Sequence, residues 1–276
     1  MFETLTTGRL ALVTAQPDGS GPDRPPILFI PGLFAGAWVF DTFLGFFAER
    51  GHPGYALNLR GREGSPLAPG ERPGRVSVRD YVADADEAAA WIEARASRPI
   101  IVGHSMGGLI AQQLAAEGRA RAAVLLSPAP PRGISVLSRG LLARQWRYLG
   151  KLLRSRPLFP RWGDARKLLL NRVPEKEQRT QFSRLVPDSG RAARELSLGA
   201  IAISADRLRE NECPVLVVAS DEDRFIPSRV VERVATRYRA PLFLARGHGH
   251  LLMQEPGWQE TAAFIEDWLE RHVDRD

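Results

Sequence analysis

The residues best suited to chemistry surround Ser105, in the segment Gly103-His104-Ser105-Met106-Gly107. An apolar run precedes this segment and a helix-forming run follows it. A serine on so tight a strand-to-helix turn has a strained backbone, so the positions two residues away must lack bulky side chains. Gly103 and Gly107 meet that requirement. The free N–H groups of a helix beginning at Met106 would favour negative charge nearby. The spacing therefore predicts Ser105 as a nucleophile.

A serine hydroxyl needs a general base within hydrogen-bond reach. The chain contains five histidines: His52, His104, His248, His250 and His272. His104 adjoins the serine and its side chain should point the other way, His52 lies in a glycine-proline turn, and His272 lies near the C-terminus. His248 and His250 remain, and each follows a glycine. A His-x-His metal site is the other interpretation, but suitable partner ligands are not nearby.

The base also needs a carboxylate that fixes its tautomer and stabilises the imidazolium. An apolar run over 215–220 ends in three acids, Asp221, Glu222 and Asp223. Any of the three could supply that carboxylate, and the other two would then be solvated loop acids.

The elements that must position these residues alternate between short apolar runs and longer amphipathic stretches, which is typical of a doubly wound, mostly parallel α/β sheet. The predicted strands are Leu10–Thr14, Ile27–Ile30, Tyr55–Leu59, Ile100–Gly103, Ala122–Ser127, Val215–Ser220 and Leu242–Ala245. The predicted helices lie near 40–50, 79–96, 106–117, 228–238 and 258–272.

The sheet pattern is interrupted over residues 134–206. Leucines and Trp146 recur at helical spacing over 137–153, and prolines divide the remainder into short helical pieces. We expect a core of 1–133 and 207–276, with 134–206 inserted as a helical cap.

The Ser105 segment and the order serine, acid, histidine resemble the α/β-hydrolase family, in its cap-bearing esterase and lipase-like branch. The resemblance covers nearly all of residues 10–272. It implies Asp223 as the acid, because that residue stands just before the apolar-proline pair Ile226-Pro227. It implies His250 as the base, because the number of residues between His250 and Glu255-Pro256 fits the family better than the number between His248 and that pair. The serine at position 105 makes a dehalogenase or an epoxide hydrolase activity less favoured, because related enzymes of those classes use aspartate in this turn.

The tetrahedral intermediate of acyl transfer also needs N–H donors aimed at its oxyanion. The resemblance assigns these donors to the backbone amides of Met106 and Leu33. Relatives usually have His-Gly where this chain has Pro31-Gly32. The replacement removes an orienting side chain, which puts the shape of this loop in question. The Arg60–Ser65 turn, which also resembles a family motif, is interpreted as architectural.

Composition limits the other functions. The chain has 276 residues, 44% hydrophobic, with one cysteine and a net charge of +6. This composition excludes intrinsic disorder, and no apolar run is long enough to cross a membrane.

Residues 132–212 hold 18 Lys and Arg against 8 Asp and Glu. That excess favours an anionic or amphipathic substrate, an anionic lipid surface, or simply a solvated exterior. No nucleic-acid motif, dinucleotide fingerprint or phosphate loop is present.

The sequence therefore predicts a cytoplasmic serine hydrolase that cleaves carboxylic esters through an acyl-enzyme on Ser105, without a metal or organic cofactor. Lactones and lipid-like monoesters are included as substrates. The same triad also occurs in cofactor-free haloperoxidases or perhydrolases and in C–C hydrolases. A third alternative is a small-ligand receptor with little turnover. The oligomeric state is not predicted.

Overall fold

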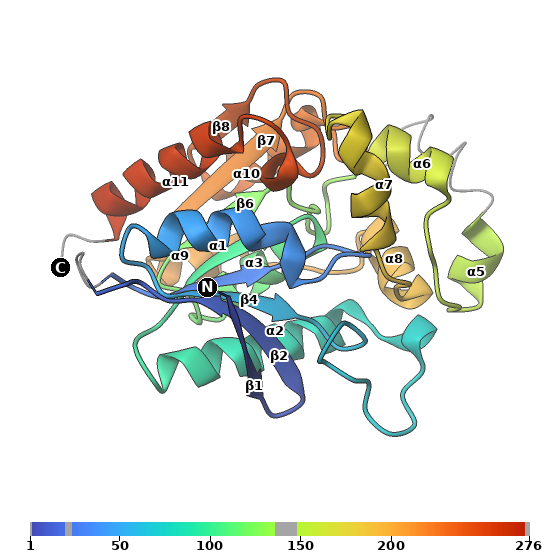
Figure 1. Ribbon diagram of the computed structural model, residues 1–276, viewed down its shortest axis with the longest axis horizontal. Helices are drawn as coiled ribbons and strands as arrows, with labels where there is room; N and C mark the ends of the chain where they lie inside the picture. Colours follow the sequence, from blue (N-terminus) through green and yellow to red (C-terminus); the bar gives the residue numbers. More distant parts are fainter. Residues whose placement is uncertain (1, 20–23, 136–147, 274–276) are drawn as a thin grey trace.

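The computed structural model describes residues 2–19, 24–135 and 148–273. Its eight strands form one sheet in the order β1-β2-β4-β3-β5-β6-β7-β8 (Figure 1). Their bounds are β1 Glu3–Thr7, β2 Leu10–Ala15, β3 Ile27–Ile30, β4 Gly54–Asn58, β5 Ile100–His104, β6 Ala123–Leu126, β7 Val215–Ser220 and β8 Leu242–Ala245. β1 and β2 pair antiparallel, and β4, β3 and β5 to β8 run parallel. The predicted doubly wound, mostly parallel sheet is confirmed.

All seven predicted strands are present, with ends that differ by at most one residue. The sequence analysis missed β1, which pairs with β2 through a turn at Gly8, where φ is 53°. Three of its five residues are threonine and its first two positions are exposed, so it lacks an apolar run. Its threonines and the glycine turn are the signals that could have predicted a hairpin.

The predicted core helices are also present, and two hydrophobic clusters place them on both faces of the sheet. They are α1 Asp41–Ala48, α2 Val78–Glu93, α3 Met106–Ala116, α10 Ser228–Tyr238 and α11 Trp258–His272. Helices α2, α3 and α10 cover one face, and α1 and α11 cover the other. Side chains of a strand alternate between the faces, as when Leu28 and Ile30 join one cluster while Ile27 and Phe29 join the other.

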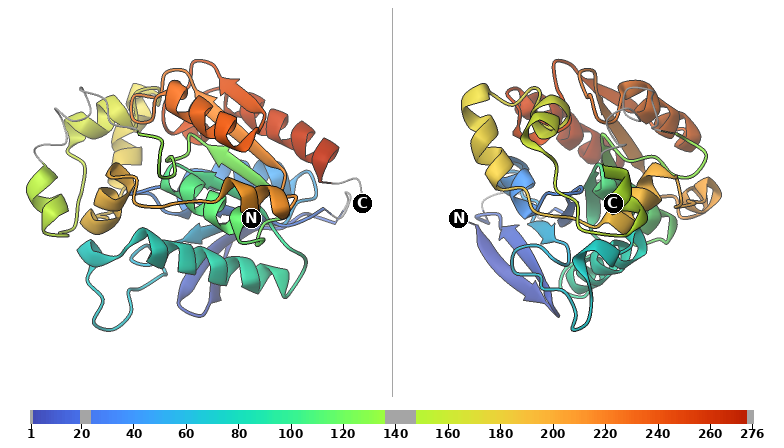
Figure 2. Two further views of the ribbon diagram at one scale, coloured as in Figure 1. Left: turned by 180° about the vertical axis from the view of Figure 1, so that it is seen from behind. Right: turned by 90° about the vertical axis from the view of Figure 1, so that its right-hand side faces the viewer.

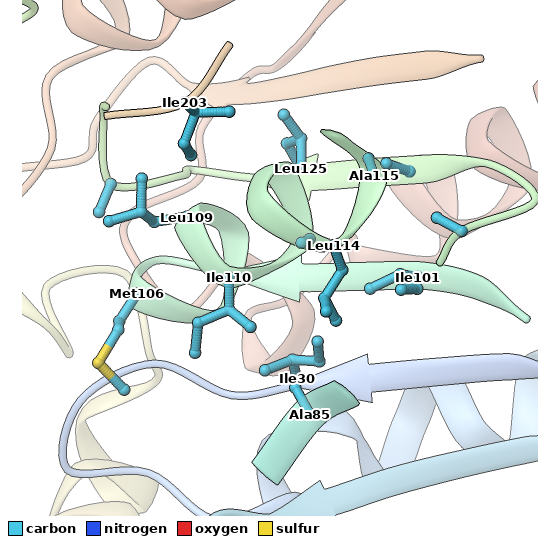
Figure 3. Close-up of a cluster of buried hydrophobic side chains, with 14 of the residues drawn as sticks. Ile30, Ala85, Ile101, Met106, Leu109, Ile110, Leu114, Ala115, Leu125 and Ile203 are labelled. Carbon is cyan, nitrogen blue, oxygen red and sulfur yellow. The ribbon is translucent and has the colours of Figure 1, made fainter. Parts of the chain in front are cut away.

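Helix α3 is anchored by its apolar face. Figure 3 shows Ile110 and Leu114 pointing toward Ile30 and Ala85, whereas Leu109 lies on the side of Ile203. This packing fixes the start of α3, and with it the position of the residue before that helix.

Further short helices lie between β6 and β7: α5 Leu149–Leu153, α6 Trp162–Leu168, α7 Glu175–Ser183, α8 Gly190–Ser197 and α9 Ala205–Glu210. Helices α5 to α8 gather at one end of the molecule, beside the carboxyl ends of the parallel strands (Figures 1 and 2). Residues 136–147 of the predicted amphipathic helix lie outside the described residues. None of the described helices is long and apolar enough to cross a membrane.

Candidate active site

Ser105 occupies the turn between β5 and α3 with φ 55° and ψ −117°, a conformation that non-glycine residues rarely adopt. The two glycines of the motif make this turn possible. A Cβ on Gly103 would overlap the Gly107 carbonyl, and a Cβ on Gly107 would overlap the Ile30 carbonyl. As the sequence predicted, neither position has room for a side chain. The turn holds the serine at the carboxyl end of a central strand.

The structure brings Ser105, His250 and Asp223 into one chain of hydrogen-bonding distances. The His250 Nε2 atom lies 3.1 Å from Ser105 Oγ, and His250 Nδ1 lies 2.8 Å from Asp223 Oδ2. All three side chains are buried, and Ser105 keeps 6% of its surface exposed. This is the relative order needed for a hydroxyl to pass a proton to an imidazole whose other nitrogen is held by a carboxylate.

The loops after β7 and β8 deliver the acid and the base. Asp223 is fixed by its second oxygen, since Oδ1 accepts hydrogen bonds from the Phe225 and Ile226 amides at 2.7 and 2.9 Å. The two loops are also joined directly, because the Glu222 amide donates to the His248 carbonyl at 2.9 Å. The carboxylate therefore has little freedom to turn away from the imidazole.

The competing residues have other partners. His248 Nδ1 lies 3.4 Å from the buried Glu255 carboxylate, which also accepts from the Gly249 amide. Asp221 accepts from the Gly247 amide, and Glu222 lies 3.7 Å from Arg172 at the surface. The geometry thus brings His250 and Asp223, not these residues, to the serine.

His104 was expected to point away from Ser105, and the structure places its ring against that of His250. Its Nε2 atom lies 2.8 Å from the His250 carbonyl oxygen and its ring centroid lies 4.7 Å from that of His250. A carbonyl only accepts, so His104 donates from Nε2. Burial, with a smaller contribution from His250, holds the pKa of His104 well below 6.5. The neutral ring therefore supports the backbone of the base.

The backbone amides of Leu33 and Met106 donate to no acceptor in the part of the chain that the structure describes. Gly32 packs directly on the serine, since a Cβ there would lie 2.8 Å from Ser105 Cβ and 3.3 Å from its Oγ. Leu33 lines the same cavity as Ser105. Unpaired backbone donors of this kind stabilise an oxyanion when they point at it.

A cavity of about 150 Å³ opens onto Ser105. Its walls are mostly apolar and come from both the core and the inserted helices, including Leu33, Phe225, Leu152, Leu158, Leu168 and Leu196. Tyr148 and Asp164 form one polar position, where the tyrosine hydroxyl donates to the carboxylate at 2.7 Å. Among the described lining residues there is no Lys or Arg, and no described cluster of acids, histidines or cysteine could hold a metal ion.

Sequence reasoning missed Asp188, which is 2% exposed and accepts a hydrogen bond from the Phe34 amide, in the loop that carries Leu33. It also did not anticipate the buried Arg62 that pairs with it at 2.6 Å. Arg62 belongs to the Arg60–Ser65 turn that the sequence marked as architectural, but it lies 126 positions from Asp188 and no local pattern indicates that the two residues pair. The serine in Asp188-Ser189 before a helical run was the only available signal, and it indicates a helix start.

This chain belongs to the α/β hydrolase family, whose model matches residues 27–264. Together with the fold and the geometry around Ser105, this match confirms the resemblance inferred from the motifs. No curated protein sequence matches the chain significantly.

Several solved structures share the fold at low sequence identity. A thermophilic esterase from Thermogutta terrifontis is 18% identical with a TM-score of 0.72, over 99% of each chain. A hydrolase from Pseudomonas aeruginosa is 18% identical with a TM-score of 0.70, over 97% of this chain and 98% of the other. A monoacylglycerol lipase from Paleococcus ferrophilus is 21% identical with a TM-score of 0.66, over 95% and 99%.

Proposed function

We propose that this protein is a serine hydrolase that cleaves carboxylic esters through an acyl-enzyme on Ser105. The observation that carries the proposal is the continuous contact from Ser105 Oγ through His250 to Asp223, beside two unpaired amides. Similarity to an esterase and a monoacylglycerol lipase supports the ester class.

Each group has a defined role in the proposed reaction. Ser105 Oγ attacks the ester carbonyl carbon while His250 Nε2 takes the hydroxyl proton, and Asp223 stabilises the imidazolium through Nδ1–H. The amides of Leu33 and Met106 donate to the carbonyl oxygen as it becomes negative. The C–O bond of the alcohol then breaks, and the alkoxide leaves with the proton from His250. A water repeats the sequence on the acyl-enzyme and releases the acid.

We propose residues 134–206 as the cap that shapes the substrate. Its described helices α5, α6 and α8 contribute apolar side chains to the cavity above Ser105. The flanking basic residues Lys151, Arg154, Arg156, Arg161, Arg166 and Lys167 are exposed. Apolar walls and outward charge favour a neutral, amphipathic ester, such as a lipid-like monoester or a lactone, over a charged acyl group. They support the solvated-exterior interpretation of the basic segment.

The proposal is tested with Ser105→Ala. Hydrolysis of p-nitrophenyl esters should fall by about 10⁴-fold or more, with an unchanged circular dichroism spectrum, since removal of such a nucleophile leaves only binding and oxyanion contributions. A fluorophosphonate probe should label the wild type and not the variant. Ser183→Ala, at an exposed serine of α7, is the matched control and should retain both properties. Retained hydrolysis in Ser105→Ala would falsify the assignment.

The expected preference for neutral substrates is tested by comparing kcat/KM for neutral and acidic esters. Matched p-nitrophenyl esters with a neutral or a terminal carboxylate acyl group are compared at low and high salt. The neutral ester should have the higher kcat/KM at both salt concentrations. A preference for the acidic ester that weakens with salt would instead indicate cationic recognition.

A further inference from the structure

Asp188, in the segment between α7 and α8, carries a buried carboxylate with four hydrogen-bond donors around it. Its Oδ2 accepts from the Phe34 amide at 2.7 Å and from Arg62 Nη2 at 2.6 Å. Its Oδ1 accepts from the Tyr81 hydroxyl at 2.7 Å and from the Ser189 amide at 2.6 Å. Each oxygen of the carboxylate thus accepts two hydrogen bonds. The Ser189 donor lies in the inserted segment, and the other three donors lie in the core.

The contact with Phe34 falls on the loop that supplies the Leu33 amide. Phe34 has φ 67°, a left-handed conformation that is costly for a bulky residue and persists only when its surroundings enforce it. Both backbone polar groups of Phe34 are held by the inserted segment, because its amide donates to Asp188 and its carbonyl accepts from the Val186 amide at 2.9 Å.

Arg62 extends the support to the other end of the loop. Its Nε donates to the Ala35 carbonyl at 2.9 Å, while its Nη2 binds Asp188. Leu33 is therefore followed by two residues whose backbone is fixed through one buried ion pair. At the other side Gly32 is fixed by contact with Ser105. The Leu33 amide lies between these two restraints.

We propose that Asp188 is a positioning residue that holds the oxyanion loop, residues 31–35, so that the Leu33 amide points to the transition-state oxygen. The inference rests on the proposed function for its kinetic consequence. Its structural part, the order of the loop, can be measured independently of any activity.

The first test is Asp188→Asn, which keeps the shape but leaves one oxygen and no charge. Because an oxyanion donor acts in the transition state, kcat should fall about 10- to 100-fold while KM changes less than about threefold. The inhibition constant of a trifluoromethyl ketone ester analogue, which forms a tetrahedral adduct, should rise by the same factor as kcat/KM falls. Unchanged kcat, or a loss confined to KM, would overturn the proposal.

A general loss of stability has to be separated from this effect. Glu266→Gln is the matched control, because Glu266 is also a buried carboxylate, paired with Arg24 and 3.4 Å from His52. Arg24 precedes β3, so this ion pair lies toward the amino ends of the strands, away from Ser105. Glu266→Gln should lower Tm and leave kcat unchanged. An equal loss of kcat in both variants would show that Asp188 acts only through stability.

If Asp188→Asn does not fold because Arg62 is left unpaired, the pair is removed together as Arg62→Met with Asp188→Leu, since apolar replacements of a buried ion pair are often tolerated. This variant still removes the Phe34 anchor, and the same kinetic loss is expected.

Amide hydrogen exchange of residues 32–36 tests the loop directly. Exchange there should accelerate at least about tenfold in either Asp188 variant and remain unchanged in Glu266→Gln. Unaltered exchange would refute the positioning role whatever the kinetics. If the wild type neither hydrolyses esters nor reacts with the fluorophosphonate, the proposed function fails, and the exchange experiment still decides whether Asp188 orders the loop.

Discussion

At the scale of single residues, two buried histidines in the loop after β8 have different environments. His250 lies between Ser105 and Asp223, whereas His248 lies beside Glu255. Only the first arrangement joins a nucleophile to an acid. Under the proposed function, we expect proton transfer at His250 and support of the loop at His248.

This assignment predicts a ranking of variants. His250→Ala should lower kcat/KM by about 10³-fold or more, because the serine loses its base. His248→Ala should lower it less than about tenfold and should lower Tm, because only a loop contact is lost. Steady-state kinetics and thermal melts of both variants decide the matter, and the opposite ranking would mean that His248 is the base.

The buried, neutral His104 predicts that the free energy of unfolding depends on pH. Its pKa in the folded protein is held well below 6.5 by burial and by His250. Below pH 6.5 the unfolded chain therefore takes up a proton that the folded protein does not, and the free energy of unfolding falls by up to about 1.4 kcal/mol per pH unit. This loss begins near pH 6.5 and continues down to the folded pKa.

His104→Gln removes this titration and keeps a donor for the His250 carbonyl. Between pH 7.5 and pH 5 the variant should lose up to about 2 kcal/mol less unfolding free energy than the wild type. Urea denaturation at the two pH values measures the difference. Equal losses in the two proteins would show that His104 is not kept neutral by the fold.

At the scale of elements, the site depends on how closely β5, α3 and the end of β3 approach one another. The Gly107 backbone packs against the Ile30 and Pro31 carbonyls, where a Cβ would lie 2.8 Å from the Pro31 oxygen and closer still to that of Ile30. The same approach places the Gly32 backbone on Ser105. Close packing of three segments therefore sets where the loop of residues 31–35 lies relative to the serine turn.

Gly107→Ala should consequently lower the free energy of unfolding by about 1–3 kcal/mol, because the methyl group has no space. Gly45→Ala is the matched control, since Gly45 lies within α1 and a Cβ there meets nothing within 4 Å. In that helix alanine should be neutral or stabilising. Chemical denaturation of both variants checks the contrast, and similar effects at the two glycines would contradict the packing argument.

At the scale of the whole molecule, the reacting groups come from the core and much of the cavity wall comes from helices inserted between β6 and β7. Under the proposed function, substrate selection could therefore change without disturbing the serine turn. Ala193 of α8 lines the cavity, and a larger side chain there would occupy part of its volume.

Ala193→Phe should lower kcat/KM for octanoyl esters by about tenfold or more and leave acetyl esters within about threefold. The acetyl ester serves as the internal control for the catalytic groups. A p-nitrophenyl ester series graded by acyl length gives the measurement. A uniform loss across the series would indicate damage to the site and not a shorter cavity.

Much of the fold could be predicted from the sequence because the signals are local. Apolar runs marked seven strands, and the glycine spacing marked the turn at Ser105. The edge strand β1 was missed because half-exposed, threonine-rich strands lack such a run. The contact of His104 with the His250 carbonyl could not be predicted, because it joins residues 146 positions apart.

The sequence by itself determined the turn at Ser105, because the glycines two residues away on the same chain leave room for it. Only the tertiary structure decided which histidine and which acid meet the serine, and that Asp188 of the inserted segment binds the Phe34 amide. The physical reason is distance along the chain. Asp188 and Arg62 are 126 residues apart, and their pairing depends on burial and on the register of separately folded segments, which no local pattern records.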